Sequence, residues 1–355
     1  MSLFEHPDYA NHERVLFAHD PATGLRALIA VHSTALGPGA GGCRMWRYDS
    51  STSALADVLR LSQSMSYKNA MAGLDLGGGK SVIMAPATTV ADREALFEAF
   101  GRAVNDLGGL YWTAEDVGVS PSDMRAARRQ TRFVAGLDEG AAASGDPSPI
   151  TALGIHLGIK VCAARAFGSE ALAGRRIAVQ GVGSVGGHLC RRLADEGAEL
   201  VISDVNADLL ERVAAQTGAR IVAPDAIIEA DADIFAPCAL GGVINDATIA
   251  RLRARVVAGG ANNQLARPDL GVALKARGVL YAPDYVINAG GIINVSAEIS
   301  GTYDRAQVEG KIANLAKTLG EVLDVAQAED RPPHEVADAM ARARIAAAKP
   351  SNSPS

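Results

Sequence analysis

The spacing of hydrophobic residues changes along the chain, and each spacing predicts a type of element. Apolar residues recur at helical intervals over 53–71 and 91–109, whereas 25–32 and 81–86 are short apolar runs typical of strands. A stretch rich in small and turn-forming residues at 136–149 indicates an interdomain hinge. The part of the chain before this hinge therefore mixes strands with long helices.

After the hinge, strand-like and helix-like segments alternate at short intervals. The predicted order is a strand at 175–180, a helix at 184–197, a strand at 198–204, a helix at 206–218, and apolar runs at 231–238, 255–262 and 278–291. Such alternation is typical of a parallel sheet covered by helices. Apolar spacing predicts two more helices, over 305–328 and after Pro333. We expect an α/β protein of two domains, divided near residue 147.

Composition narrows the class of protein. A chain of 355 residues, 48% hydrophobic and 21% charged, fits a globular protein of two domains. The formal net charge of −6 argues against a nucleic-acid partner. No apolar run is long enough to cross a bilayer, and the N-terminus lacks the apolar segment of a signal peptide. We therefore expect a cytoplasmic protein without membrane or nucleic-acid partners.

The cysteines and histidines indicate no metal site. Cys43, Cys162, Cys190 and Cys238 are scattered and never in C-x-x-C spacing, as expected of free thiols in a reducing compartment. The seven histidines show neither H-x-x-x-H pairing nor cysteine neighbours. Structural or catalytic zinc needs such groupings, so no metal is predicted.

A glycine motif stands between a predicted strand and a predicted helix. Gly181, Gly183 and Gly186 follow the G-x-G-x-x-G order, and the next strand ends on Asp204, about 20 residues further on. Gly181 permits a tight turn, Gly183 lets the backbone approach a pyrophosphate at the helix N-terminus, and Gly186 allows close packing. Asp204 would bind the ribose hydroxyls and repel a 2′-phosphate, which favours NAD over NADP. The alternative is an ordinary α/β turn with a surface aspartate.

The predicted NAD site extends beyond the glycines, in a Rossmann domain over 148–330. The other residues expected to contact the cofactor are Thr151, Ser184, Val185, Val205, Cys238, Ala239, Asn262 and Asn288. Asn262 and Asn288 end apolar runs, where ligands bind in sheets of this type. Whether Asn262 or Asn263 makes the contact stays open, because an asparagine can equally cap a turn. Cys238 is expected to be a packed residue rather than a nucleophile, since no histidine lies nearby in the sequence.

Three glycines at 77–79 precede Lys80 and suggest a triphosphate-binding loop. That loop needs a glycine where this chain has Leu74, and a helix where the residues after Lys80 predict a strand. An ATPase loop is therefore excluded. We interpret the three glycines as a turn that lets ligands approach the backbone, and Lys80 requires another role.

Several long motifs resemble one known family. They are LGPGAGGCRMW, MSYKNAMAGLDLGGGKSVI, TAEDVG, GDPSPITALG, APCALGGVIND, AGGANNQL and YAPDYVINAGGIIN. Together they resemble the glutamate/leucine/phenylalanine/valine dehydrogenase superfamily, most closely its leucine dehydrogenases, from about residue 10 to the last helix. The resemblance implies NAD-dependent, reversible oxidative deamination of an L-amino acid to a 2-oxo acid and ammonium. It also implies a homo-oligomer, from dimer to octamer, assembled through an N-terminal α/β substrate domain at 1–147. A cleft would separate the two domains, and a helix at 331–347 would pack back on the first; the tail at 348–355 is expected to be frayed.

The resemblance assigns the catalytic groups. Lys80 takes the catalytic role, Lys68 grips the substrate carboxylate, Asp116 exchanges protons at the α-amino group, and Asn262 and Asn288 help to orient substrate and nicotinamide. A base near neutral pH is needed to activate water, and a solvated lysine, with a pKa of about 10.4, is too basic. Burial and a second ammonium both lower a lysine pKa, and we expect Lys68 to supply that second charge. The alternative is that the lysines are surface cations and Asp116 is a cap.

The resemblance also suggests an apolar side-chain pocket. Its residues are Ala40, Gly41, Met65, Ala114, Ile292 and Val295. Ala40 offers no partner to a second substrate carboxylate, and burying an unpaired charge is costly, so glutamate is disfavoured. Ala40 enlarges the pocket, which is typical of the phenylalanine enzymes. Ala114 and the branched residues Ile292 and Val295 instead resemble leucine dehydrogenases. One methylene of pocket changes discrimination by only about 1–3 kcal/mol. Branched-chain amino acids, leucine first, are the prediction, with phenylalanine or a broad hydrophobic range as the alternative.

Two other classes of protein are less favoured. A catalytically silent NAD-binding protein would be supported by loss of Lys68, Lys80 or Asp116, and all three are present. A 2-hydroxy acid dehydrogenase on the same cofactor fold would need a His–carboxylate or arginine arrangement downstream of the glycine motif, which this sequence does not show. The sequence therefore predicts an amino acid dehydrogenase.

Overall fold

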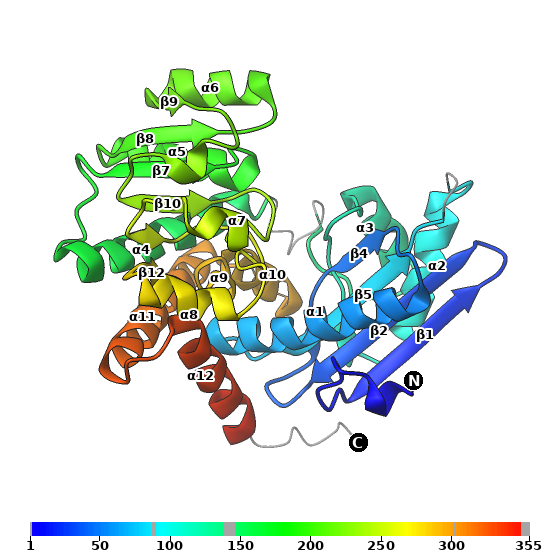
Figure 1. Cartoon of the computed structure of the whole chain (residues 1–355). Helices are drawn as coiled ribbons and strands as arrows, with labels where there is room; N and C mark the ends of the chain where they lie inside the picture. Colours follow the sequence, from blue (N-terminus) through cyan, green and yellow to red (C-terminus); the bar gives the residue numbers. More distant parts are fainter. Residues whose placement is uncertain (1, 87–89, 138–145, 302, 349–355) are drawn as a thin grey trace. The chain divides into compact units, whose positions relative to one another are not determined.

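The chain divides into two compact units. A computed structural model describes residues 2–86, 90–137, 146–301 and 303–348 (Figure 1). Unit 1 contains Met1–Asp146, Asn294–Arg305 and Ala341–Ser355, and unit 2 contains Pro147–Ile293 and Ala306–Met340. Most of the predicted hinge, at 138–145, and the predicted frayed tail from residue 349 lie outside the described residues.

Unit 1 is built on a six-stranded mixed sheet. The strand order is β1 (Arg14–Asp20), β2 (Leu25–Ser33), β5 (Gly77–Met84), β3 (Gly39–Ala40) and β6 (Tyr111–Trp112), with β4 (Cys43–Trp46) also paired to β5. β1, β2 and β5 run antiparallel, whereas β3 and β4 run parallel to β5. β5 is therefore a central strand, and all its residues except the last are buried.

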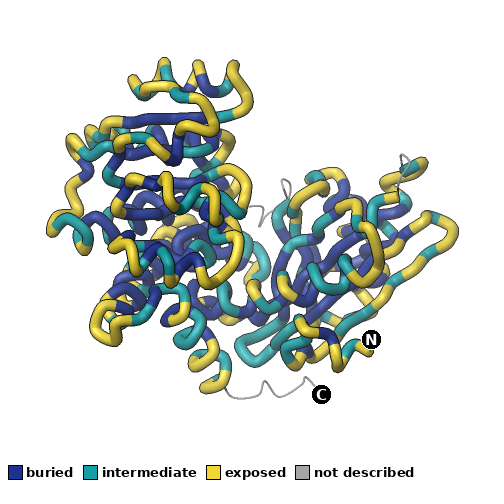
Figure 2. The backbone as a smooth tube through the Cα atoms, in the orientation of Figure 1, coloured by how far each residue is buried: buried dark blue, intermediate teal, exposed yellow. Residues whose placement is uncertain are grey.

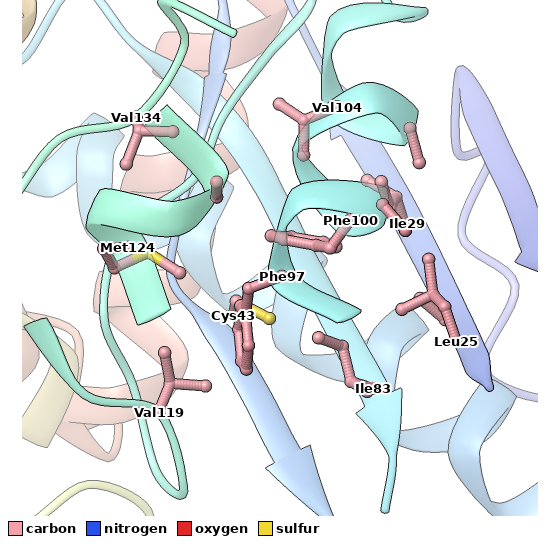
Figure 3. Packing of buried hydrophobic residues seen from close by; sticks show 14 of the residues in the cluster. Leu25, Ile29, Cys43, Ile83, Phe97, Phe100, Val104, Val119, Met124 and Val134 are labelled. Atoms are coloured by element: carbon pink, nitrogen blue, oxygen red, sulfur yellow. The ribbon is translucent and has the colours of Figure 1, made fainter. Parts of the chain in front are cut away.

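Helices cover both faces of this sheet. α1 (Ser51–Met71) packs its Val58 and Leu59 against Leu28 of β2, and the alternate residue Ile29 contributes to a second cluster. Because successive strand residues point to opposite faces, the two clusters lie on opposite sides of the sheet. Figure 3 shows the second cluster, where α2 (Arg93–Asn105) and α3 (Pro121–Arg128) cover the strands. Phe97 of α2 is fully buried there.

Unit 2 is built on a parallel six-stranded sheet. The order is β12 (Leu280–Tyr281), β11 (Val256–Val257), β10 (Ile234–Pro237), β7 (Arg176–Gln180), β8 (Glu199–Ser203) and β9 (Arg220–Ile221). The chain enters at β7, adds β8 and β9 on one side, and then adds β10 to β12 on the other. The order therefore reverses between β7 and β10, which is where ligands bind in open sheets of this kind.

Four of the remaining helices, at 184–195, 207–217, 305–328 and 333–347, match helices predicted from the sequence, and the others were not predicted. The remaining helices are α4 (Ser148–Phe167), α5 (Ser184–Asp195), α6 (Ala207–Thr217), α7 (Asp246–Ile249), α8 (Asp269–Ala276), α9 (Asp284–Ile287), α10 (Gly290–Ile299), α11 (Arg305–Ala328) and α12 (Pro333–Ala347), with short 3₁₀ turns at Leu3–Glu5 and Ile227–Glu229. The Asn206 side chain caps α6 by accepting from Leu209 N, and Gly218 ends it in the left-handed conformation. Figure 2 shows that the sheet strands of each unit are mainly buried and the helices partly exposed.

The α/β fold class predicted from the sequence is confirmed, with a mixed sheet in unit 1 and a Rossmann-like parallel sheet in unit 2. One local prediction was wrong: the three glycines before Lys80 belong to strand β5 and form no turn. A Cβ on Gly77 would lie 1.9 Å from the Ser33 oxygen, and one on Gly78 would lie 2.1 Å from Ser66 Oγ. The glycines are therefore needed because β2 and α1 approach this strand closely.

The expectation that no apolar run could cross a bilayer also needs correction. α4 is long and apolar enough by length and composition, as a core helix of a soluble protein can be. Half of its apolar window is buried inside the structure, and α4 packs on α5 and α9. Its His156 side chain lies 3.1 Å from the Glu196 carboxylate. We interpret α4 as a core helix of unit 2.

Candidate active site

The Lys80 ammonium and the Asp116 carboxylate form a close ion pair in unit 1. Lys80 is 6% exposed, and its Nζ lies 2.6 Å from Asp116 Oδ2. Arg44 approaches the same oxygen, with its Nε at 3.4 Å. Asp116 stands in the loop after β6, and its neighbour Val117 accepts a backbone hydrogen bond from Met45 of β4. The sheet thus brings together two groups that the sequence places far apart.

Two cations keep the Asp116 carboxyl ionised. Burial by itself raises its pKa, but the charge and hydrogen bond of Lys80, together with the charge of Arg44, outweigh burial and lower the pKa of Asp116 below its ordinary value. The carboxylate is therefore charged at neutral pH. A charged carboxylate can receive a proton from a substrate ammonium group and return it to the nitrogen.

α1 brings Lys68 to the same unit, next to a buried asparagine. Lys68 is half-buried in the last turn of α1. The adjacent Asn69 is fully buried and donates from Nδ2 to the Gly77 oxygen at 2.6 Å and to the Ala40 oxygen at 3.4 Å. Asn69 therefore joins α1 to the strands that carry Lys80 and Ala40. Sequence reasoning missed Asn69; the available signal was a polar residue on the buried face of a predicted helix.

Four residues of the predicted side-chain pocket lie in unit 1. Ala40 is buried in β3, and Gly41 follows it where the chain passes α1: a Cβ on Gly41 would lie 3.0 Å from Met65 Cγ. Ala114 follows β6, and its carbonyl accepts a hydrogen bond from Cys43 N at 2.7 Å. All four are apolar residues, as a pocket for a hydrophobic side chain would require.

The other two predicted pocket residues lie on α10. Ile292 is buried and Val295 is half-buried. Residues three apart share one face of a helix, so both belong to the same apolar stripe. Between them Asn294, which is fully buried, accepts a hydrogen bond from Tyr303 Oη at 2.9 Å.

The glycine motif of unit 2 fits a dinucleotide. Gly181 has a φ of +88°, and a Cβ on Gly186 would lie 2.0 Å from the Gly181 oxygen, so this turn needs glycine at both positions. Gly183 is the N-cap of α5, makes no side-chain cap, and has open space where a Cβ would stand. Backbone N–H groups at such a helix N-terminus bind phosphate. Ser184 and Val185 begin this helix.

Asp204 stands immediately after β8 and supports the glycine turn. Its Oδ2 accepts from Val182 N at 2.7 Å and its Oδ1 from Asn206 N at 2.9 Å. Each carboxylate oxygen keeps a second acceptor site, so ribose hydroxyls can still bind. Val205 beside it is 92% exposed.

The two residues that follow β10, the strand next to β7, lie against the glycine motif. A Cβ on Gly181 would lie 2.7 Å from the Ala239 Cβ, and one on Gly186 would lie 3.3 Å from the Cys238 Cβ. Burial raises the pKa of the Cys238 thiol to about 11, so the thiol is neutral and poorly nucleophilic at neutral pH.

Two predicted asparagines meet in unit 2: Asn262 lies in the loop after β11, whereas Asn288, expected at the end of a strand, is instead the C-cap of helix α9. Asn288 Nδ2 donates to Asn262 Oδ1 at 2.8 Å and to the Gly260 oxygen at 3.2 Å. Asn263 instead adopts a φ of +51° and its carbonyl accepts from Gly242 N. Asn263 therefore has the geometry of a turn residue, whereas the Asn262 side chain is held by Asn288. Thr151 of α4 is buried against the N-terminal end of helix α10, where a Cβ on Gly291 would lie 3.3 Å from its Oγ1.

A dinucleotide-binding sheet in one unit and a buried lysine–aspartate pair in the other are the parts of a nicotinamide-dependent dehydrogenase. Residues 12–133 match the dimerisation domain of the Glu/Leu/Phe/Val dehydrogenases, and residues 206–352 match the Glutamate/Leucine/Phenylalanine/Valine dehydrogenase domain. The chain belongs to this family, as the resemblance in the sequence indicated. It is therefore an amino acid dehydrogenase, an oxidoreductase acting on CH–NH₂ donors.

Individual relatives differ in the amino acid in their names. The chain is 47% identical to leucine dehydrogenase of Geobacillus stearothermophilus, over 100% of this chain and 96% of that enzyme. It is 43% identical to phenylalanine dehydrogenase of Bacillus thermotolerans, over 98% of this chain and 91% of that enzyme. The crystal structure of L-tryptophan dehydrogenase from Nostoc punctiforme has a TM-score of 0.84 and 41% identity, covering 96% of this chain and 98% of that one.

Proposed function

We propose that this enzyme oxidises branched-chain L-amino acids, leucine first, to their 2-oxo acids and ammonium with NAD, reversibly. The observation that carries the proposal is the buried Lys80–Asp116 ion pair, 2.6 Å long, in a family of amino acid dehydrogenases. The buried Ala40 supports a hydrophobic substrate side chain, because it offers no partner to a second carboxylate. Asp204 supports NAD, since its negative charge disfavours a 2′-phosphate.

The proposed mechanism divides the reaction among the residues of unit 1. When bound, NAD supplies the acceptor for the hydrogen and electron pair of the substrate Cα–H bond. Lys68 binds the substrate carboxylate, and Asp116 receives a proton from the α-ammonium group. Lys80, once its own proton has been released, takes a proton from water as the water oxygen bonds to the imine carbon. Asp116 then returns its proton to the nitrogen. The C–N bond breaks as the hydroxyl group becomes the carbonyl of the 2-oxo acid, and the hydroxyl proton leaves with ammonia as ammonium.

We also propose the finer assignments of the two regions. Residues 1–147 form the substrate-binding and oligomerisation domain and 148–330 the NAD-binding domain, with the helix at 331–347 returning to the first. The matched dimerisation domain implies a homo-oligomer, which we propose to lie between dimer and octamer, in the cytoplasm. β1 is an edge strand of its sheet and Phe17 on it is 60% exposed, which makes this edge a candidate contact between copies.

A steady-state substrate panel tests the proposed function. We expect the highest kcat/KM with leucine, lower values with isoleucine and valine, a still lower value with phenylalanine, and none with glutamate. NAD should be preferred over NADP by at least about tenfold, equivalent to about 1.4 kcal/mol. The measurement is nicotinamide reduction by the purified enzyme with each amino acid and each cofactor. A preference for phenylalanine, glutamate or NADP would contradict the corresponding assignment.

Ala40→Leu tests the side-chain pocket. The added branch should fill space that an aromatic ring needs, so we expect kcat/KM with phenylalanine to fall roughly tenfold further than kcat/KM with leucine. The ratio of the two values is measured, because any loss of folded enzyme then cancels. Ala313→Leu, on the exposed face of α11, is the control and should leave the ratio unchanged. An unchanged ratio in Ala40→Leu would mean that this position does not contact the side chain.

A further inference from the structure

Arg44 links the reactive pair to a second carboxylate and a tyrosine. Its Nε lies 3.4 Å from Asp116 Oδ2, and its Nη1 donates to Asp57 Oδ2 at 3.1 Å. Asp57, on α1, also accepts a hydrogen bond from Tyr48 Oη at 2.6 Å. Charges therefore alternate along the row Lys80, Asp116, Arg44 and Asp57. None of the four side chains is more than about a quarter exposed, the largest value being 24%.

The backbone sets Arg44 opposite Asp116. β4 is paired with β5 on one side, where Arg44 is in register with Val82. On its other side, Cys43 forms a bridge with Glu115, and Met45 N donates to the Val117 oxygen at 2.9 Å. The neighbours of Arg44 are thus paired through the backbone with the neighbours of Asp116. This pairing places the Arg44 and Asp116 side chains next to each other.

The Asp116 carboxyl also acts on the Cys43 thiol and on the Tyr48 and Tyr111 hydroxyls, and burial raises the pKa of both tyrosines. Burial raises the pKa of the adjacent Cys43 thiol to about 12, so it is neutral at working pH. Among the described residues, the charges that act most strongly on the Asp116 carboxyl are Lys80 from β5 and Arg44 from β4. Arg44 thus supplies a second, permanently charged counter-ion to a carboxylate that Lys80 would otherwise hold alone.

We propose that Arg44 is a positioning residue for the reaction: anchored by Asp57 and Tyr48, it holds the Asp116 carboxylate ionised and aimed at Lys80. The planar guanidinium suits this role because it can address two carboxylates at once in fixed directions. The lysine is then not the sole partner of Asp116, and the carboxylate stays available to the substrate amine. This inference rests on the proposed function.

Arg44→Gln removes the charge while keeping polar atoms. The positive charge of Arg44 lowers the pKa of Asp116, so its removal should raise that pKa and move the acid limb of the kcat/KM profile to higher pH. We expect kcat to fall roughly tenfold to a hundredfold, the low end of what positioned proton transfer contributes, with KM for leucine changed less than about threefold. Arg60→Gln removes the same charge from the exposed face of α1 and is the matched control, with both readouts unchanged.

Two further variants keep the test decisive if Arg44→Gln fails to fold. Arg44→Lys keeps the charge but cannot span both carboxylates, so kcat should fall while the acid limb stays near its original pH. Asp57→Asn removes the anchor without touching Asp116 and should lower kcat at least about threefold. Wild-type kcat in either folded variant would overturn the inference. Absence of amino acid oxidation in the wild-type enzyme would instead overturn the proposed function.

Discussion

Gly78→Ala is expected to destabilise unit 1 and to remove activity. A Cβ at this position would lie 2.1 Å from Ser66 Oγ, 2.2 Å from Ser66 N and 2.5 Å from the Ser62 oxygen. Two of these three atoms are backbone atoms of α1, so a rotamer change cannot relieve the contact. Either α1 or β5 must move, and these elements carry Lys68 and Lys80.

Overpacking of a filled core costs about 1–3 kcal/mol and occasionally more, and we expect Gly78→Ala to reach the upper end of that range. The free energy of unfolding is measured by denaturant titration and deamination by steady-state kinetics. Gly310→Ala is the control: this glycine lies exposed in α11 with open space around its would-be Cβ. Alanine there should raise stability by about 0.5–1 kcal/mol, because glycine weakens a helix. An unchanged unfolding midpoint in Gly78→Ala would contradict the close contact between α1 and β5 at this position.

Lys80→Ala is expected to give the largest loss of activity of any single substitution considered. The variant loses the proposed base for activation of water and leaves Asp116 paired to Arg44 alone. Positioned acid–base catalysis contributes about 10²–10⁴-fold, and we expect kcat for leucine deamination to fall by at least about a thousandfold. NADH binding should change little, since the glycine motif and Asp204 belong to unit 2.

Lys317→Ala supplies the matched control for Lys80→Ala. It removes the same side chain from an exposed position on α11 and should leave kcat within about twofold, as surface substitutions usually have small effects. A comparable loss in both variants would point to a general effect on folding rather than to chemistry at position 80.

Much of the fold could be predicted because long elements carry a clear period. The helix at 53–71 and the helix at 305–328 match α1 and α11 to within two residues. Gly181, Gly183 and Gly186 were interpretable because a strand, a turn and a helix must follow one another within a few residues. The two-residue strands β3 and β6 had no such signal, since two residues cannot display a period. Their place in the sheet is set by tertiary pairing.

The candidate site likewise contains residues that local motifs predict and contacts that only the tertiary fold reveals. Lys68, Lys80 and Asp116 could be named from motifs, but Arg44 as a second partner of Asp116 could not. Arg44 lies in the short run CRMW, where a single cation between apolar residues gives no sign that it faces Asp116. The glycines at 77–79 were predicted as a turn because glycine usually breaks strands, and only the close approach of β2 and α1 explains them in β5.

The central claim is that Lys80, beside Asp116, carries the hydrolytic chemistry of an NAD-dependent amino acid dehydrogenase. Its most direct test is the rate at which Lys80→Ala releases 2-oxo acid from leucine and NAD, on a sample whose NADH affinity has been measured by fluorescence titration. The account predicts wild-type NADH affinity and release of 2-oxo acid at least about a thousandfold slower than wild type. Release of 2-oxo acid at close to the wild-type rate would contradict it.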